Sequence, residues 1–537
     1  MNRLAHEGRA ALLASLLLGG CGGDGGREAP PNVVLISLDT LRADHLSCYG
    51  YGRETSPNID ALAASGVLFE DTVSTTSWTL PAHMSMLTGL AVSAHGICDE
   101  RLWQITGQPG GPDELPLRGT FLSEVLQRAG YATGGFVTWK YLEERFGFGP
   151  GFDVYERLGL TIWDVPEWEA RFEDLRTRGR AGDQDAVAEY ERWKAEEPHV
   201  FDQGLPTADL AVTRALEWVD GRAEASEPFF LFLHLFDIHD PYVPPKEFDR
   251  FDPNYEGTID GKRISTADSP VHAEMDPRDL ERVVSLYDGE IAWVDSQIGR
   301  VLDRLEALGL REDTVVVLTS DHGEEFFEHG GKTHRGQLHR ESVHVPLVIS
   351  WPGGLPAGRR VVGTTGIVDI LPTVCGLVEA QAPACLSGRD LSAVARGEEA
   401  NAPPDYTTHL VVFPPGDEPP HLHVGLYHDD RHVLLVQRPG RQPAVEVFDH
   451  SKNAREEGPG RVVVPGSPEA EELLRWRDEA IAGLGSVRSC SAVRVTDVMR
   501  LTPEELALLE ATGYGGGDAN PVGAHDRLCI EGCFWVR

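Results

Sequence analysis

The chain has 537 residues, of which 41% are hydrophobic, so it is long and apolar enough for a large core and for about two to four average domains. Its formal net charge of −37 at pH 7 excludes a general affinity for nucleic acids or anionic membrane surfaces, because phosphate groups are bound by clustered lysines and arginines. An anionic substrate would need a local positive charge, and a bound metal ion is the simplest source of one.

The first 21 residues have the features of a secretory signal. Arg3 and Arg9 are followed by an apolar run over residues 10–18, which is too short to span a bilayer, and then by Leu18-Gly19-Gly20-Cys21. These four residues resemble the lipobox of a bacterial lipoprotein, although a plain signal peptide with an incidental cysteine is the alternative. Residues 22–31 (GGDGGREAPP) are typical of a flexible tether. We therefore predict lipidation at Cys21 and export to the bacterial cell envelope, on the periplasmic side or the cell surface.

A continuous apolar run rich in β-branched residues covers residues 32–38 (NVVLISL) and ends at Asp39. This pattern predicts a central parallel strand that is buried on both faces. Open α/β sheets bind their ligands at the carboxyl ends of such strands, so Asp39 is a candidate site residue. Residues 58–66 (NIDALAASG) predict a helix that a glycine ends.

Residues 74–89 (STTSWTLPAHMSMLTG) predict a short helix that begins at Leu80 or Pro81, with Thr79 as its N-cap and Gly89 at its end. The unpaired backbone N–H groups at such a helix end would stabilise an alkoxide or a bound anion at Thr79. An ordinary capping threonine is the alternative, and for this stretch alone it is the commoner case.

Further along, residues 121–129 predict a helix and residues 131–138 a strand. The segment of about residues 155–200 is rich in Trp, Glu, Asp and Arg. We interpret it as an insertion that controls access to the site, with a solvated surface helix as the alternative. Residues 229–236 (FFLFLHLF) predict another buried strand, closely followed by His239. Residues 286–308 predict a helix whose acidic residues lie mostly on a solvated face.

Residues 314–318 (TVVVL) predict a strand that leads into Asp321 and His322. Two buried strands thus end in an aspartate, and parallel pairing would bring these ends to one edge of the sheet. Residues 328–345 are dense in His, Lys and Arg. Three histidines of this region are more simply explained as surface or core residues than as metal ligands: His329, His339 and His344. Residues 346–350 begin a further strand.

The main domain is expected to cover residues 32–400, and residues 401–537 are expected to form a small C-terminal α+β domain. Short alternating segments predict antiparallel strands over 409–413, 423–428, 432–437 and 444–448, and helices over 469–483 and 502–512. Cysteine pairing stays open, with Cys375–Cys385 and Cys529–Cys533 as plausible disulfides in an exported protein.

Several segments in this order resemble the sulfatase family within the alkaline phosphatase superfamily: NVVLISLDTLRADHLSCYGY, SPNIDALAASGVLFED, TLPAHMSMLTG, HLFDIHDPYVPP, YDGEIAWVDSQIG, TSDHGEEFFEHGG, VDILPTVCGL and LTPEELALLEATGY. The resemblance covers about residues 32–514. It implies a large, doubly wound α/β domain with a mixed, mostly parallel sheet, and a smaller C-terminal α+β domain.

The resemblance also implies roles for single residues. Asp39, Asp321 and His322 match metal-ligand positions, and Thr79 matches the nucleophile, which is itself a ligand. Residues implied to contact the substrate or to assist the leaving group are His239 and His334, and those near the anion-binding positions are Lys332 and His83.

Three departures from the family pattern change the expected chemistry. Sulfatases oxidise a Cys or Ser to formylglycine, and Thr79 cannot give that aldehyde, so no formylglycine is expected. His83 stands where the family has Arg, and Thr40 where it has a second Asp. The set is similar to that of members with an unmodified threonine, such as lipoteichoic acid synthase, phosphoethanolamine transferases and nucleotide phosphodiesterases. Its mixed oxygen and nitrogen ligands favour one Mn²⁺ or Zn²⁺ over Ca²⁺.

The leading hypothesis is a membrane-anchored envelope lipoprotein that hydrolyses or transfers a sulfuric or phosphoric ester through Thr79, with His239 or His334 as general acid. Phosphoester or phosphonate chemistry is slightly preferred because of the nucleophile. The expected partners are an anionic ester, such as a glycan or lipid headgroup, and the membrane through the lipid anchor, with no nucleic acid. The alternative is a catalytically degenerate sulfatase-fold protein that binds an anionic envelope glycan or lipid, which the residues His83 and Thr40 favour.

Overall fold

The structure is a computed structural model that describes residues 30–95, 97, 119–159, 166–196, 207–265, 269–402, 406–412, 421–428, 430–438, 441–453 and 455–478. Several predictions lie outside these residues: the signal sequence with Cys21, most of the tether, the helix over 502–512, and the pair Cys529 and Cys533. No helix in the described part of the chain is long and apolar enough to cross a membrane.

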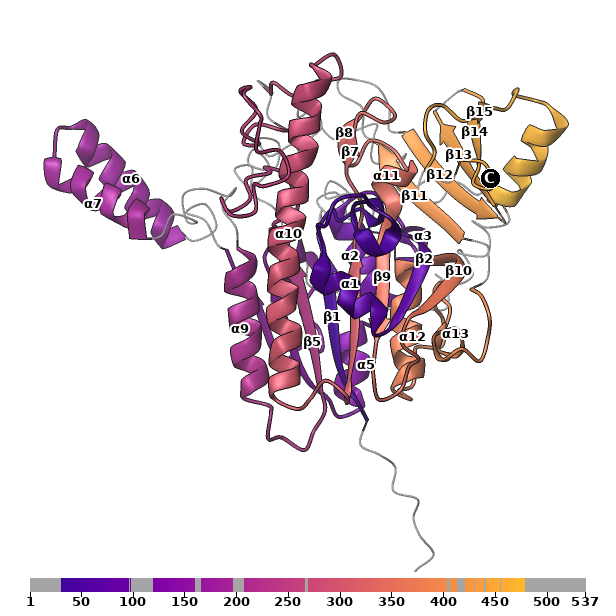
Figure 1. Ribbon diagram of the computed structural model, residues 1–537, viewed down its shortest axis with the longest axis horizontal. Helices are drawn as coiled ribbons and strands as arrows, with labels where there is room; N and C mark the ends of the chain where they lie inside the picture. The colour runs from indigo at the N-terminus through magenta and orange to yellow at the C-terminus, as the bar shows by residue number, and fades with distance from the viewer. Residues whose placement is uncertain are drawn as a thin grey trace, which may run out of the picture. The chain divides into compact units, whose positions relative to one another are not determined.

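The main sheet has eight strands in the order β10-β2-β9-β6-β1-β5-β3-β4. Several of them, among them β1, β5 and β9, are labelled in the middle of Figure 1. Only β9 runs antiparallel to its neighbours within this sheet, and the central strand β1 pairs in parallel with both β5 and β6. The strands are β1 (Asn32–Leu38), β2 (Val67–Val73), β3 (Ala132–Val137), β4 (Val154–Arg157), β5 (Phe229–Leu235), β6 (Thr314–Ser320), β9 (His344–Ser350) and β10 (Arg359–Gly366).

Helices cover both faces of this sheet, because the central strands are apolar on both sides. Along β1, Val33 and Leu35 belong to one hydrophobic core and Val34 and Ile36 to the other, as expected when successive side chains of a strand point to opposite faces. The first core includes α2 (Thr79–Thr88), α5 (Leu122–Arg128), α12 (Ile370–Leu377) and α13 (Ser392–Arg396). The second includes α1 (Pro57–Ala64), α9 (Ala208–Asp220) and α10 (Pro277–Ala307), of which α9 and α10 lie side by side (Figure 1).

Shorter elements connect these layers. They are α3 (Val92–His95), α11 (Arg340–Val343), the two-stranded pair β7 (Glu325–Phe326) and β8 (Lys332–Thr333), and the 3₁₀ helices Ala43–His45, Ser47–Tyr49, Lys140–Leu142, Glu144–Phe146 and Ile367–Asp369.

The C-terminal part contains a separate antiparallel sheet of five strands: β11 (Tyr406–Val412), β12 (His421–His428), β13 (Arg431–Gln437), β14 (Ala444–Asp449) and β15 (Arg461–Val462). A helix over residues 468–478 contributes Ala470 and Leu473 to the apolar face of this sheet. The predicted fold class is therefore confirmed, and the short β15 is an addition that the alternation pattern did not indicate.

Between β4 and α9, α6 (Pro166–Arg180) and α7 (Gln184–Glu196) form a helical hairpin. The two helices pack around a small apolar group that includes Leu175, Ala186 and Trp193. A role of this insertion in substrate access stays a prediction.

Two predictions of local detail are wrong. Helix α10 begins earlier than expected, and several of its acids are buried rather than solvated, because they bind partners on other elements. Asp288 accepts hydrogen bonds from Tyr51 and Arg53 and lies 2.8 Å from His45 Nδ1. The disulfide Cys375–Cys385 does not form: Cys375 is a free thiol within the core, and Cys385 is bonded to another cysteine.

Asp295 of α10 holds the start of α1. Its carboxylate accepts hydrogen bonds from the backbone N–H groups of Asn58 and Ile59 at 2.8–3.1 Å, whereas the N-cap residue Ser56 makes no capping bond with its own side chain. The first turn of α1 therefore depends on a residue far away in the chain.

We predict that Asp295→Ala lowers the free energy of unfolding by about 2–4 kcal/mol, because it leaves two backbone donors without an acceptor. Urea unfolding followed by circular dichroism measures this loss. The matched control is Asp303→Ala, an exposed position of the same helix, which should change stability by less than about 0.5 kcal/mol. Equal urea midpoints for the two variants would contradict the capping role.

Candidate active site

Two buried carboxylates meet at one edge of the main sheet. Asp39 follows β1 and Asp321 follows β6, and these neighbouring parallel strands are in register, with Leu38 opposite Ser320. Both side chains are completely buried. Asp321 Oδ1 accepts from the backbone N–H groups of Thr40 and His322, but Asp39 Oδ1 and Asp321 Oδ2 make no hydrogen bond with any described residue. Two buried carboxylate oxygens thus lack a hydrogen-bond donor among the residues that the structure describes.

His322 adds a nitrogen to this pair. Its Nδ1 donates to the Gly323 carbonyl at 2.9 Å, so its Nε2 faces the acids, 3.3 Å from Asp321 Oδ2 and 3.8 Å from Asp39 Oδ1. The ligand atoms of Asp39, Asp321 and His322 lie within 4.8 Å of one another. A backbone carbonyl that orients the imidazole is the usual support of a metal-binding histidine.

Thr79 supplies a hydroxyl to the same place. Its Oγ1 lies 3.4 Å from Asp39 Oδ2 and 3.4 Å from His322 Nε2, and the residue is fully buried. Helix α2 begins at Thr79 itself with Trp78 as N-cap, one or two residues earlier than predicted, and the Thr79 hydroxyl points to Asp39 and His322 instead of capping the helix. The helix stops at Gly89, with φ of 66°, as expected.

A cation would stabilise the ionised forms of Asp39 and Asp321, which are buried side by side. Burial alone would raise the pKa of Asp39, but the hydrogen bond with His234 and the nearby imidazoles lower it to about 2. Burial, and then the charge of Asp39, raises the pKa of Asp321 well above its ordinary value. Burial also lowers the pKa of His322 to about 4, which keeps a nitrogen lone pair available. Two carboxylates, a neutral imidazole and a hydroxyl fit a divalent metal ion.

His239 and His334 lie beside these residues. The ring of His334 is 4.5 Å from that of His322 and 4.8 Å from that of His239, measured between centroids. His334 Nδ1 lies 3.2 Å from Glu324 Oε1, and the Tyr242 hydroxyl donates to the other Glu324 oxygen. Nδ1 of His239 donates to the Asp240 carbonyl at 2.7 Å. Both rings are therefore held at the edge of the acid cluster.

The two residues expected to hold the anion are placed differently from the prediction. Lys332 Nζ donates to the carbonyls of Ile264 and Val271, both at 2.8 Å. Its ammonium group therefore binds backbone carbonyls rather than being directed to the acids. His83 is fully buried, with Nε2 2.8 Å from Ser37 Oγ and Nδ1 2.9 Å from the Thr79 carbonyl. Burial lowers the pKa of His83 to about 3, so it is neutral and supports the first turn of α2 rather than presenting a positive charge.

Three further residues lie close to the acids or to α2, and the sequence analysis did not select them. His234 of β5 has Nε2 3.2 Å from Asp39 Oδ2, and its signal in the sequence was a histidine within an otherwise apolar strand. Arg335 donates from its backbone N–H to Ser77 O and places its guanidinium 4.2 Å from the ring of Trp78, the residue before Thr79. Lys140 is buried in a 3₁₀ helix that contacts α2. Arg335 follows His334 directly, and Lys140 comes shortly after β3, but no local pattern marked either.

A family model described as Sulfatase matches residues 31–380. The chain belongs to the sulfatase family. Arylsulfatase D of Homo sapiens is 24% identical over 512 residues, which cover 80% of this chain and 79% of that protein. The phosphonate monoester hydrolase of Agrobacterium radiobacter has a similar structure, with a TM-score of 0.62 and 22% identity over 85% of this chain and 96% of that chain. A protein solved with its substrate D-glucosamine-2-N,6-O-disulfate has a TM-score of 0.62 and 17% identity, over 85% and 98% of the two chains.

This sulfatase-family chain is an ester hydrolase, and the family is metal-dependent. The similar structures show its alkaline phosphatase-like fold. The acid cluster at the sheet edge supplies donors of the kinds that such a metal needs.

Proposed function

We propose that this sulfatase-family hydrolase cleaves or transfers an anionic ester by means of an unmodified Thr79. Phosphoric or phosphonic esters are preferred to sulfuric esters. The observation that carries the proposal is the position of Thr79 Oγ1, 3.4 Å from both Asp39 Oδ2 and His322 Nε2 and at the N-terminus of α2. A threonine has no route to formylglycine, so the hydroxyl itself is the available nucleophile.

Four residues would hold one divalent ion: Asp39, Thr79, Asp321 and His322. When bound, the ion lowers the pKa of the hydroxyl and neutralises the anion under attack. With Thr40 in place of a second aspartate at β1, the set has a nitrogen and few carboxylates. This composition favours Mn²⁺ or Zn²⁺, with Ca²⁺ as the all-oxygen alternative, and metal analysis of the purified protein distinguishes them.

The residues of the chain account for the remaining steps. Thr79 Oγ1 gives its proton to Asp39 Oδ2, to which it donates at 3.4 Å, and bonds to phosphorus while the bond from phosphorus to the leaving oxygen breaks. The leaving oxygen takes a proton from His239 or His334, which lie together beside His322. Burial and the neighbouring imidazoles lower the pKa of His334 well below its ordinary value, so His334 can serve as the acid only when the bound anion offsets this effect. Water or an acceptor hydroxyl then releases the phosphoryl group from Thr79. Arg335 and Lys140 provide the positive charge that His83 lacks.

The natural substrate on this proposal is an anionic ester of an envelope glycan or lipid headgroup. A sulfuric ester is the second candidate, because one structurally similar protein is complexed with a disulfated glucosamine as its substrate. A catalytically degenerate binding protein remains a distinct outcome, which a lack of turnover with every ester would indicate.

The decisive test compares wild type with Thr79→Ala on an aryl sulfate, a phosphate monoester, a phosphodiester and a phosphonate monoester. We expect the phosphodiester or phosphonate to react fastest. Thr79→Ala should lower kcat/KM at least about 1,000-fold, the scale of losing a nucleophile. Metal should stay bound in this variant, because three ligands remain. Wild-type enzyme quenched during turnover should yield a peptide with phosphorylated Thr79.

Ser77→Ala is the matched control, since Ser77 is also buried and lies two residues before the nucleophile. It should retain near wild-type kcat/KM. Activity confined to the sulfate ester and unchanged in Thr79→Ala would refute the mechanism.

The choice of general acid predicts a dependence on the leaving group. Replacing the acid should slow an alkyl ester by about 100–10,000-fold but affect a p-nitrophenyl ester much less, because nitrophenolate departs without a proton. Steady-state kinetics of His334→Ala and His239→Ala on the two esters measure this difference. If both variants slow the two esters equally, neither histidine is the acid.

We also propose that the enzyme is exported and anchored to the cell envelope by a lipid on Cys21. Support comes from the basic, apolar and Leu-Gly-Gly-Cys pattern of residues 1–21. We expect wild type in the membrane fraction and Cys21→Ala in the soluble fraction, with palmitate label incorporated only into wild type. Palmitate label in the Cys21→Ala protein would exclude this anchor. The control is Cys48→Ala, which should be labelled like wild type.

A further inference from the structure

His234 is a fully buried histidine near the end of β5, a strand whose other residues are all apolar (FFLFLHL). The parallel register of β1 and β5 pairs His234 with Ser37, so its side chain shares a face of the sheet with Ser37 and with Asp39, two residues further on. Helix α2 covers this face, and the ring of His83 meets the His234 ring edge-on, at 4.9 Å between centroids. The fold thus places an imidazole beside one acid of the active site.

The imidazole of His234 contacts Asp39 through one of its nitrogens. Nε2 lies 3.2 Å from Asp39 Oδ2, whereas Nδ1 is buried and has no hydrogen-bond partner among the described residues. Buried N–H groups without an acceptor are rarer in proteins than buried acceptors without a donor, so the ring hydrogen belongs on Nε2. A protonated ring would add an N–H at Nδ1 with no acceptor for it. His234 therefore donates a hydrogen bond to Asp39 Oδ2.

The two oxygens of Asp39 consequently have different partners. Oδ2 accepts from His234 and from Thr79 Oγ1, which lies 3.4 Å away. Oδ1 accepts from no described residue and lies 3.8 Å from His322 Nε2. Oδ1 is therefore the oxygen that is available to a metal ion. Carboxylates that bind a metal are usually held by hydrogen bonds of their own, and these partners affect metal affinity.

Packing alone does not explain a histidine at this position. A leucine, like Leu233 and Leu235 on either side, would fill the apolar strand without burying a nitrogen that lacks a partner, and such a group costs about 1–3 kcal/mol. The sheet fixes the backbone of Asp39, whose N–H donates to the Leu235 carbonyl at 2.9 Å. It does not fix the rotation of the carboxylate, and the hydrogen bond from His234 does.

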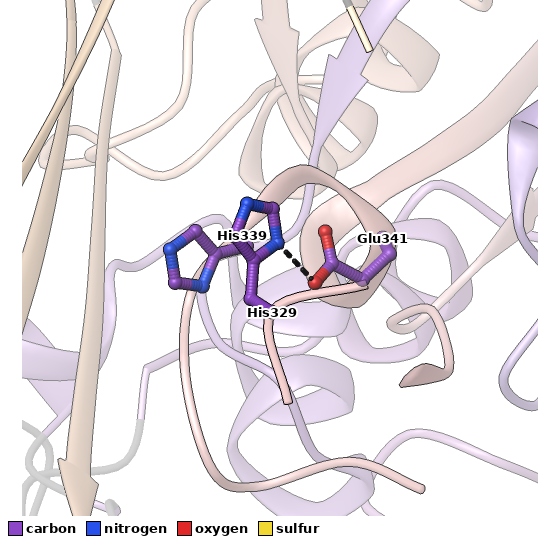
Figure 2. Close-up of side chains that lie close together, drawn as sticks. All are labelled: His329, His339 and Glu341. Carbon is purple, nitrogen blue, oxygen red and sulfur yellow. Dashed lines mark hydrogen bonds and ion pairs between the residues drawn. The ribbon is translucent and has the colours of Figure 1, made fainter. Parts of the chain in front are cut away.

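A second histidine group has a different explanation. Figure 2 shows His329, His339 and Glu341, which lie on the segment between β7 and β9. His329 Nδ1 is 2.7 Å from Glu341 Oε1, and its Nε2 donates to the Gly458 carbonyl at 3.1 Å. The rings of His329 and His339 are stacked at 3.8 Å with planes 5° apart, so their nitrogen lone pairs cannot meet at one ion. This group therefore links the segment to the C-terminal part, and we assign no ligand to it.

We infer that His234 is a positioning residue for the metal ion of the active site: its Nε2–H holds Asp39 Oδ2, so that Asp39 Oδ1 is presented to the ion. The inference rests on the metal site of the proposed function. It requires neither that Thr79 is the nucleophile nor that the substrate is a particular ester. His234 is not itself a metal ligand, because its Nε2 is bonded to Asp39.

The test measures the dissociation constant (Kd) of Mn²⁺ and of Zn²⁺ for the full-length protein, by equilibrium competition with a chromophoric chelator. His234→Leu keeps β5 apolar but removes the donor, and it should raise Kd about 10–100-fold, the usual cost of losing an outer partner. His234→Gln is the conservative variant, because its amide nitrogen is as many bonds from the backbone as Nε2 and can donate in its place. Its Kd should stay within about threefold of the wild-type value.

The matched control is His95→Leu, which removes another fully buried imidazole, one that bonds to Ser85 of α2 at 3.0 Å and lies outside the acid cluster. It should leave Kd unchanged. Circular dichroism checks that each variant is folded. If His234→Leu does not fold, His234→Met replaces it, since methionine has the length of glutamine but no donor.

A rise in Kd of less than about tenfold in folded His234→Leu or His234→Met would overturn the inference. An equal rise in His234→Gln would do the same, because the donor would then not be the cause. A wild-type protein that binds neither ion would refute the metal site of the proposed function and the inference with it. These readouts involve no turnover, so they are independent of the outcome for Thr79.

Discussion

Two carboxylates buried side by side, Asp39 and Asp321, are the constraint on which the rest of this structure depends. Neighbouring parallel strands bring them to one edge, and the apolar strands around them exclude the water that would screen their repulsion. The backbone N–H groups of Thr40 and His322 satisfy one oxygen of Asp321, but two carboxylate oxygens still face a shared space. A divalent ion is the natural counterpart of such a pair, and it accounts for a hydroxyl and an imidazole being directed there.

Thr79, the candidate nucleophile, lies next to residues that contact the segment between β7 and β9, which carries His334. Arg335 bonds to Ser77 O and stacks over Trp78, the residue before Thr79. His334, its neighbour, is oriented by Glu324, which Tyr242 holds in turn. The same segment carries His329, His339 and Glu341, and it reaches Gly458 of the C-terminal part.

The family's arginine is replaced by His83, which is buried, neutral and bonded to Ser37 and Thr79. We propose that Arg335, which stacks over Trp78, and Lys140, in a 3₁₀ helix that contacts α2, supply the positive charge for the anion instead. An unoxidised threonine and a metal site with few carboxylates both suit a phosphorus centre better than formylglycine chemistry does.

The sequence by itself determined the features that depend on neighbouring residues. The β-branched runs that end at Asp39 and Asp321 predicted the central strands, proline and glycine predicted α2, and the ordered segments predicted the sulfatase fold. Only the tertiary structure decided which polar side chains turn inward and what they bind. Lys332 binds loop carbonyls, Asp295 caps a distant helix, Cys375 stays a thiol, and His329 stacks on His339. Periodicity shows which face of an element is apolar, but partners far apart in the chain are set by packing between elements, which no local pattern records.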